Sequence, residues 1–211
     1  MDRAAMVAKL DAAEAIVKHE FTQFDQVNSE GGRAYCQDDW PTFHSQRLGQ
    51  FLTWPAELLH SYAADLDAAD DSGRNLLTEK YARMMASTEP ERYASEIEPH
   101  LPTLSEERIA AQERIIATQV QWAQDFHHEY PRLGANMRLL HTADDTLDDT
   151  SFETYLRGEL GTYSSATLEL YAAMIDDCLA RGSNLTAQTV SITVGLAGYQ
   201  SLDDAESDQS N

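Results

Sequence analysis

A 3.6-residue hydrophobic period runs through most of this 211-residue chain and constrains its fold more than any other feature. Within residues 3–27 one helical face would carry Met6, Leu10, Ala13, Val17, Phe21 and Phe24. Good N-cap residues stand before four later segments of the same period, at Asp39, Thr53, Ser105 and Ser151. The sequence therefore predicts an all-α protein.

Short connections between these segments favour antiparallel neighbours in one bundle. We expect a single helical domain over residues 1–202, built from seven or eight helices, and a disordered acidic tail over residues 203–211. The segment 185–199 is ambiguous, because Val190, Ile192 and Val194 alternate as they would in a strand. No other segment offers such a strand a partner, so we expect a helix there too.

The formal net charge of −21 bears on the class of partner. Nucleic acids and anionic membranes are bound by clustered Lys and Arg, so neither is expected as the main partner. No run of about 18 apolar residues predicts a spanning helix, and the first twenty residues lack the apolar centre of a signal peptide. The two cysteines, Cys36 and Cys178, do not form a disulfide framework. A cytoplasmic protein with unbridged thiols is the simplest expectation.

Several charged or amide side chains fall on or beside the apolar faces of the predicted helices. In helical projection these inward residues are Glu20, Arg47, Gln50, Lys80 and Glu159. A buried charge must be paired or hydrogen-bonded, so these residues either pair with one another or bind a ligand. The first interpretation is a structural ion-pair network, and the second is a pocket with convergent charges. Four aromatic residues around Arg47 favour the pocket, and with it a small anionic or planar ligand: Trp40, Phe43, Phe51 and Trp54.

The stretch "NSEGGRAYCQDDW", at residues 28–40, has the densest set of reactive side chains in the chain. Gly31 and Gly32 suit a reversal of the chain, and Asp39 suits a helix cap. A plain turn does not require the remaining residues, which are Glu30, Arg33, Cys36, Gln37 and Asp38. This stretch is either an active-site loop or a well-capped turn between two helices.

Cys36 is a candidate nucleophile because it precedes a helix N-terminus, which lowers the pKa of a thiol. The neighbouring Asp38 and Asp39 oppose that effect, and a packed cysteine is the commoner outcome. Cys178 aligns with Leu168 and Ile175 and is expected in the core.

Candidate metal ligands do not follow a known pattern. Glu-x-x-His at 57–60 and Asp-x-x-His at 125–128 do not make the two Glu-x-x-His pairs of a di-iron bundle, so no metal site is predicted and no cofactor is named. The acidic run that begins at His141 is either a lid, a metal-binding loop or a solvated loop. Glu79 with Arg83, and Glu153 with Arg157, stand four residues apart, as surface helix pairs do.

Four stretches together are similar to a known family: "NSEGGRAYCQDDW", "NLLTEKYARMM", "LLHTADDT" and "SFETYLRGEL". They resemble a bacterial domain-of-unknown-function family, number four thousand one hundred and twenty-five, over nearly the whole chain. Its hallmark is N-x-E-G-G-R-A-x-C-Q-D-D, which residues 28–39 match. The resemblance implies no named activity. What the resemblance does imply is an accessory or substrate-handling role beside a nucleotidyltransferase-like domain.

Two hypotheses about function follow. In the first, the protein is an enzyme or small-molecule-binding protein whose pocket lies under the 28–39 stretch. Its candidate catalytic residues are Glu20, Glu159, Cys36 and Asp38, with burial raising the pKa of an acid or base. Its candidate ligand-binding residues are Asn28, Glu30, Arg33, Gln37, Arg47, Gln50, Lys80, His141, Tyr155 and Arg157. In the second, it is a helical module that docks a protein partner through the same stretch, with a nucleotidyltransferase-like protein as the expected partner.

Overall fold

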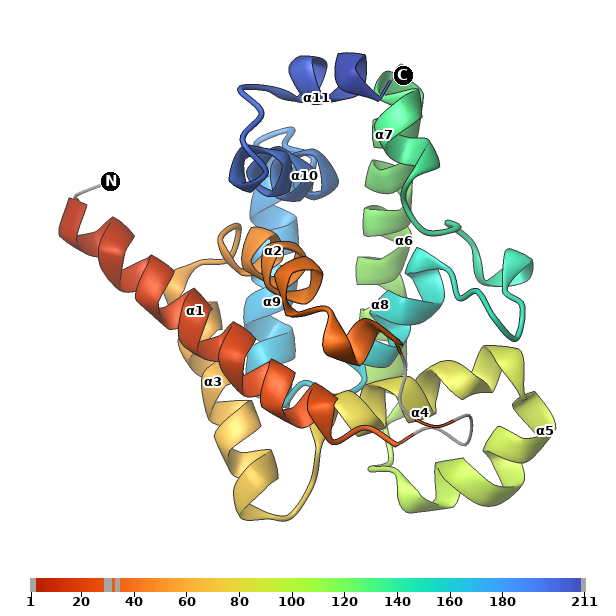
Figure 1. Cartoon of the computed structure of the whole chain (residues 1–211). Helices are drawn as coiled ribbons and strands as arrows, with labels where there is room; N and C mark the ends of the chain where they lie inside the picture. Colours follow the sequence, from red (N-terminus) through yellow and green to blue (C-terminus); the bar gives the residue numbers. More distant parts are fainter. Residues whose placement is uncertain (1–2, 29–31, 33–34, 210–211) are drawn as a thin grey trace. The chain divides into compact units, whose positions relative to one another are not determined.

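The computed structural model describes residues 3–28, 32 and 35–209, and in these residues the chain forms α-helices and no strands. The longer helices are α1 (Arg3–Asp25), α2 (Trp40–Phe51), α3 (Ala56–Asp71), α4 (Leu76–Thr88), α6 (Glu106–Glu129), α8 (Phe152–Leu160), α9 (Ser165–Ala180) and α10 (Leu185–Leu196). Three shorter ones are α5 (Pro90–Arg92), α7 (Pro131–Ala135) and α11 (Leu202–Asp208) (Figure 1). The predicted all-α class is confirmed.

The described residues thus hold eleven α-helices, where the sequence predicts seven or eight. The difference lies in α5, α7 and α11, which have three, five and seven residues. A hydrophobic period of 3.6 needs more than two turns to become visible, so sequence periodicity misses such elements. The ambiguous segment at 185–199 is helical over Leu185–Leu196, as expected.

Three of the four expected helix caps are present. The side chains of Asp39, Ser105 and Ser151 each accept a hydrogen bond from the backbone N–H three residues later. The fourth expectation, Thr53, is wrong. The Thr53 hydroxyl donates instead to the carbonyl oxygen of Gln50 at 2.6 Å, and Pro55 occupies the N-cap position of α3.

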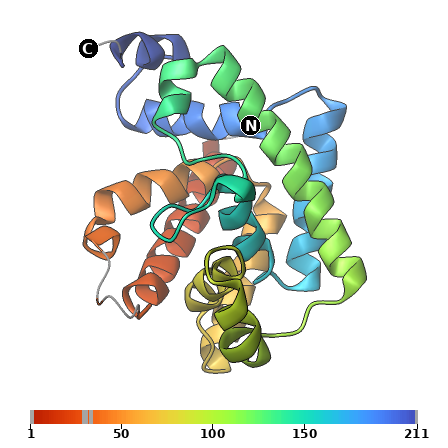
Figure 2. The same ribbon diagram turned by 90° about the vertical axis from the view of Figure 1, so that its right-hand side faces the viewer.

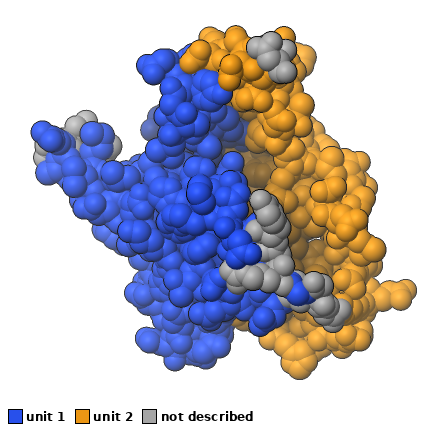
Figure 3. Space-filling model, viewed as in Figure 1, with its two compact units in different colours: residues 1–78, 163–201 blue, residues 79–162, 202–211 orange. Residues whose placement is uncertain are grey.

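The chain divides into two compact units, coloured separately in Figure 3. Unit 1 comprises residues 1–78 and 163–201, and unit 2 comprises residues 79–162 and 202–211. Unit 1 therefore contains α1, α2, α3, α9 and α10, and unit 2 contains α5, α6, α7, α8 and α11, with the division falling inside α4. That residues 1–202 form a single domain stays a prediction.

Unit 1 is built around α3, which packs against α1 and α9, while α2 packs against α1 and α10. Its centre is a cluster of large aromatic side chains, each at most 2% exposed: Phe51, Trp54, Tyr62, Tyr163 and Tyr171. Gly49 lets α2 approach α10, because a Cβ at this position would lie 2.2 Å from the Thr193 hydroxyl oxygen. Of the helical face predicted for α1, Ala13, Val17 and Phe24 are buried, and Phe21 is half-buried.

Unit 2 is built around the long helix α6, which packs against α7 and α8 (Figure 2). Helix α8 also approaches α4 closely, since a Cβ at Gly158 would lie 2.8 Å from the Lys80 carbonyl oxygen. The sequence analysis expects disorder over residues 203–211, whereas the structure places Leu202–Asp208 in α11. The Glu206 carboxylate accepts hydrogen bonds from Arg132 N at 2.9 Å and Leu133 N at 2.8 Å, so it caps the first turn of α7.

Both cysteines are unbridged, as predicted: Cys36 is exposed, and Cys178 is buried in the core of unit 1. Among the described residues, no helix has both the length and the apolar character needed to cross a membrane.

Candidate ligand-binding site

The inward charges of unit 1 pair with each other. Arg47 on α2 donates from Nε and Nη2 to the two carboxylate oxygens of Glu20 on α1, both at 2.6 Å. Tyr62 on α3 donates to the same carboxylate at 2.6 Å, and Arg47 Nη1 donates to Gln50 Oε1 at 2.6 Å. Glu20 is 0% and Arg47 is 5% exposed. This bidentate, hydrogen-bonded geometry is what allows an ion pair to be buried.

The four aromatic residues expected around Arg47 divide between two clusters. The Phe51 ring lies against Arg47, with the guanidinium carbon 4.7 Å from the ring centroid, and Trp54 packs edge-on against Phe51. Trp40 and Phe43 pack instead around Phe21 of α1, with ring centroids 4.8 and 5.1 Å away. The aromatic residues of α2 therefore pack this helix against its neighbours in unit 1. A ligand-binding role for Arg47 stays a prediction, and this geometry does not support it.

A second buried pair joins α4 to α8 in unit 2. Lys80 Nζ donates to Glu159 Oε2 at 2.7 Å, and both residues are 2% exposed. The Lys80 ammonium also lies 3.5 Å from the centroid of the Tyr155 ring, and the Arg138 guanidinium carbon lies 4.6 Å from the same centroid. Three predicted site residues, Lys80, Tyr155 and Glu159, thus come together as a charge pair covered by an aromatic ring.

The 28–40 stretch is only partly described, and Glu30 and Arg33 lie outside the described residues. Gln37 is buried, and its amide donates to the carbonyl oxygens of Phe24 and Val27 at 2.7 and 2.9 Å. It therefore satisfies acceptors at the C-terminal end of α1, where helical carbonyls lack partners. Asn28, Cys36 and Asp38 are exposed, and a catalytic role for Cys36 or Asp38 stays a prediction.

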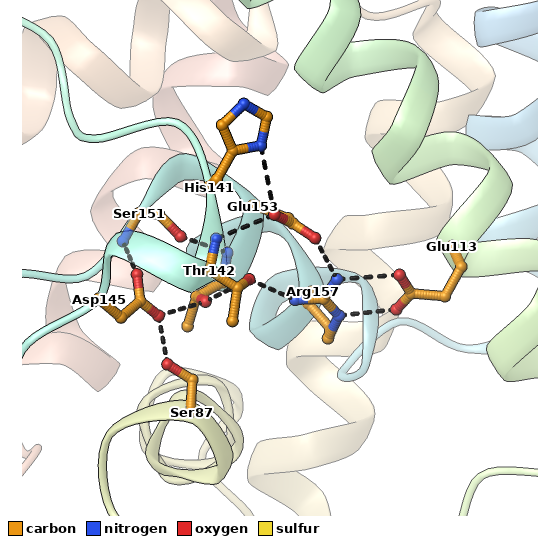
Figure 4. Close-up of polar contacts among 9 residues, drawn as sticks. Ser87, Glu113, His141, Thr142, Asp145, Ser151, Glu153 and Arg157 are labelled. Carbon is orange, nitrogen blue, oxygen red and sulfur yellow. Dashed lines mark hydrogen bonds and ion pairs between the residues drawn. The ribbon is translucent and has the colours of Figure 1, made fainter.

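Asp145 is the centre of a hydrogen-bond network in unit 2 (Figure 4). Its carboxylate accepts from the Ser87 hydroxyl on α4, from the Thr154 hydroxyl at 2.5 Å and from Ser151 N at 2.6 Å. Burial acts to raise the pKa of Asp145, but these hydrogen bonds outweigh it and leave the pKa below its usual value. The network ties the 136–151 loop to α4 and to the first turn of α8.

The same network continues to Arg157, a predicted ligand-binding residue on α8 (Figure 4). Arg157 donates to both carboxylate oxygens of Glu113 on α6, at 2.7 and 2.9 Å, and to Glu153 at 2.8 Å. Its Nη1 donates to the Thr142 hydroxyl at 3.0 Å. The hydrogen bonds with Glu113 are the main cause of a raised Arg157 pKa, opposed by burial and reinforced by Glu153. The guanidinium is thus held in one fixed orientation.

His141, another predicted ligand-binding residue, belongs to the edge of this network. Its Nδ1 lies 3.8 Å from Glu153 Oε2, and its Nε2 is 2.7 Å from the Gln124 amide nitrogen. Glu153 also accepts from Thr142 N at 2.9 Å. Burial acts to raise the pKa of Glu153, but the Thr142 and Arg157 hydrogen bonds lower it below its usual value.

A pocket of about 240 Å³ opens beside Arg157 in unit 2. One part of its wall is apolar and includes Leu101, Leu104 and Ile109, and Ile109 is 44% exposed. The polar part of the lining consists of Arg83, Tyr93, Glu98, Thr103, Gln112, Glu113 and Arg157. The volume falls below the roughly 300–1,000 Å³ that is typical of sites for drug-sized ligands.

Arg83 on α4 is fixed at this pocket by its surroundings. Its Nη2 donates to the carbonyl oxygen of Pro102 at 2.7 Å. Its side-chain stem packs so closely on α8 that a Cβ at Gly161 would lie 2.6 Å from Arg83 Cδ. Burial raises the pKa of the adjacent Tyr93 hydroxyl, although Arg83 acts to lower it, so Tyr93 is a neutral hydrogen-bonding group at neutral pH.

Most residues of this pocket are not predicted as site residues from the sequence. Arg83 has the four-residue spacing from Glu79 that is typical of a surface pair, and Tyr93 and Leu101 fall within residues 87–104, where three prolines interrupt the helical period. Of the predicted site residues that the structure describes, Arg157 alone lines the pocket. The only sequence feature that stands out in residues 87–104 is the three prolines, Pro90, Pro99 and Pro102. They predict that this segment is not one continuous helix.

The depressed pKa of Asp145 predicts a pH effect. Asp145 stabilises the fold above the unfolded-state pKa of about 3.9, and this contribution is lost as pH falls through its lower folded-state pKa. We therefore expect Asp145→Asn to be less stable than wild type at neutral pH, with the difference shrinking below about pH 4. Urea unfolding across this range measures it. Asp148→Asn, at an exposed residue of the same loop, is the control and should show no such trend.

In the described part of the chain, no group of three or more His, Cys, Asp or Glu side chains is placed to hold a metal ion. The acidic run after His141 is instead a hydrogen-bonded loop, in which Asp145 accepts bonds from two hydroxyl groups and one backbone N–H.

Comparison with known proteins gives one match. No curated protein and no solved structure shows significant similarity to the chain. One family model, described as a protein of unknown function (DUF4125), matches residues 11–207. The match includes the 28–40 stretch, the Asp145 loop and every residue that lines the pocket. The chain belongs to the DUF4125 family of proteins of unknown function.

Proposed function

We propose that the protein binds a small molecule with an apolar body and an anionic group in the pocket of unit 2. The observation that carries this proposal is the lining of that pocket, which combines apolar side chains with two guanidinium groups, Arg83 and Arg157. Guanidinium groups bind carboxylates and phosphates with directional hydrogen bonds, and an apolar wall adds affinity through burial.

The two arginines of the lining have different described partners. Glu113 and Glu153 largely neutralise Arg157 through direct hydrogen bonds. Arg83 donates to a backbone carbonyl and lies beside the neutral Tyr93 hydroxyl. We propose Arg83 as the anion-binding group because it lines the pocket and the Pro102 carbonyl oxygen holds its guanidinium there. We propose that Arg157 holds the wall of α6 and α8 in place around the ligand.

The proposed binding is tested by thermal melts of the protein with a set of small carboxylates and phosphates, their neutral methyl esters, and amines of similar size. We expect acids to raise the melting temperature and the matched esters to have little effect. Ala86→Trp should abolish the shift because Ala86 lines the pocket. The control is Ala110→Trp, at an exposed residue of α6 outside the lining, which should keep the shift.

Two results would contradict the proposal. An acid-dependent shift that persists in Ala86→Trp would place the ligand elsewhere. A shift caused by amines and not by acids would mean that the carboxylates of Glu98 and Glu113 select the ligand.

A further inference from the structure

The N-terminal turns of α1 present an apolar patch that the rest of unit 1 does not cover. Met6, Val7 and Leu10 are 55%, 50% and 41% exposed. They precede the buried part of the same helix, which begins at Ala13. Figures 1 and 3 show these turns extending past α2 and α3, within unit 1.

The spacing of this patch is that of a helix–helix seam. Arg3, Val7, Leu10 and Glu14 follow one another at intervals of four, three and four residues. At 100° per residue they fall within about 60° of one another on the helix surface, as the first and fourth positions of a heptad do. Two apolar residues thus stand between a cation at one end and an anion at the other.

This order of residues is complementary to itself. If two such helices pair antiparallel about a two-fold axis, Val7 faces Leu10 of the second copy and Arg3 faces Glu14 of the second copy. A two-fold axis produces each contact twice, which is the property of an isologous dimer interface. A parallel pairing would place Arg3 against Arg3 and Glu14 against Glu14, and like charges oppose such pairing.

We propose that the N-terminal turns of α1 bind the same turns of a second copy of this chain in an antiparallel helix pair. The existing contacts of Glu14 leave room for this pairing. Glu14 Oε1 lies 3.0 Å from His44 Nε2, so Oε2 remains for Arg3 of the second copy. The seam is about three turns long, which suits a weak or transient dimer.

The proposal is tested by sedimentation equilibrium of the full chain at concentrations up to roughly 1 mM, the weak limit of specific association. We expect a monomer–dimer equilibrium that Leu10→Glu weakens at least tenfold. Leu179→Glu replaces a leucine that is 52% exposed on α9 of the same unit, and it should leave the equilibrium unchanged. Circular dichroism of each variant verifies that the helices remain folded.

A charge exchange tests the antiparallel orientation. Arg3→Glu and Glu14→Arg should each weaken the dimer several-fold, and the double variant should restore it. A wild type that stays monomeric over the whole range, or a dimer that Leu10→Glu leaves intact, would overturn the proposal. Single substitutions that weaken the dimer without recovery in the double variant would overturn the antiparallel pairing.

Discussion

Replacing Arg47 by methionine is expected to lower the free energy of unfolding by about 3–5 kcal/mol. Arg47 is the only cation described in direct contact with the Glu20 carboxylate, which has no solvent exposure. Without the guanidinium, that carboxylate stays buried with the Tyr62 hydroxyl as its remaining described donor, or it takes up a proton. Urea unfolding at neutral pH and at about pH 5 measures both possibilities, because protonation would reduce the loss at lower pH.

The matched control is the double variant Glu20→Leu with Arg47→Met. Replacing both partners by apolar side chains of similar size removes the stranded charge, and such replacements are often neutral or stabilising. We expect the double variant to recover most of the lost stability. If Arg47→Met alone cost less than about 1 kcal/mol, water or a ligand would already reach Glu20, and the pocket interpretation of Arg47 would be restored.

Lys80→Met is expected to have an effect of similar size, about 3–5 kcal/mol of unfolding free energy. It strands Glu159, which is 2% exposed, and it removes the ammonium that lies over the Tyr155 ring. Chemical unfolding followed by circular dichroism measures the loss.

The Lys80 site allows a sharper control than the Arg47 site. Glu159→Gln in the Lys80→Met background removes the stranded charge while keeping the side-chain shape, so it should recover part of the loss. Tyr155→Leu alone should lower the free energy of unfolding much less, because a cation–π contact contributes only about 0.5–2 kcal/mol. Equal stability of Lys80→Met and wild type would show that Glu159 has other sufficient partners.

The helical class and most long helices are predictable from this sequence because both follow from local rules. Asp39, Ser105 and Ser151 cap their helices through their own side chains, a property that depends on a few neighbouring residues. Thr53 is equally plausible by the same rule but donates to Gln50 instead, because the preceding helix ends close to it. Residues 202–208 form a helix in which Glu206 contacts α7. No local sequence pattern in this acidic segment predicts that contact.

The inward charges are predictable as buried, because helical phase places Glu20, Arg47 and Glu159 correctly. Which charge pairs with which is a matter of tertiary structure, and phase alone carries no such information. The pocket is harder to predict from the sequence than the buried charges are. Leu101 and Leu104 of its apolar wall belong to residues 87–104, where no helical period is visible, and Arg83 has the same sequence spacing as an ordinary surface pair.

The most direct test of the account compares two arginines in one titration. The ligand is the acid that gives the largest melting shift, and calorimetry measures its dissociation constant for wild type, Arg83→Met and Arg47→Met at a temperature where all three are folded. We predict that Arg83→Met weakens binding about 10- to 100-fold, as expected for loss of a charge-assisted hydrogen bond. Arg47→Met should leave the dissociation constant unchanged. The opposite result, with Arg47→Met abolishing binding and Arg83→Met leaving it intact, would contradict the account and move the ligand to unit 1.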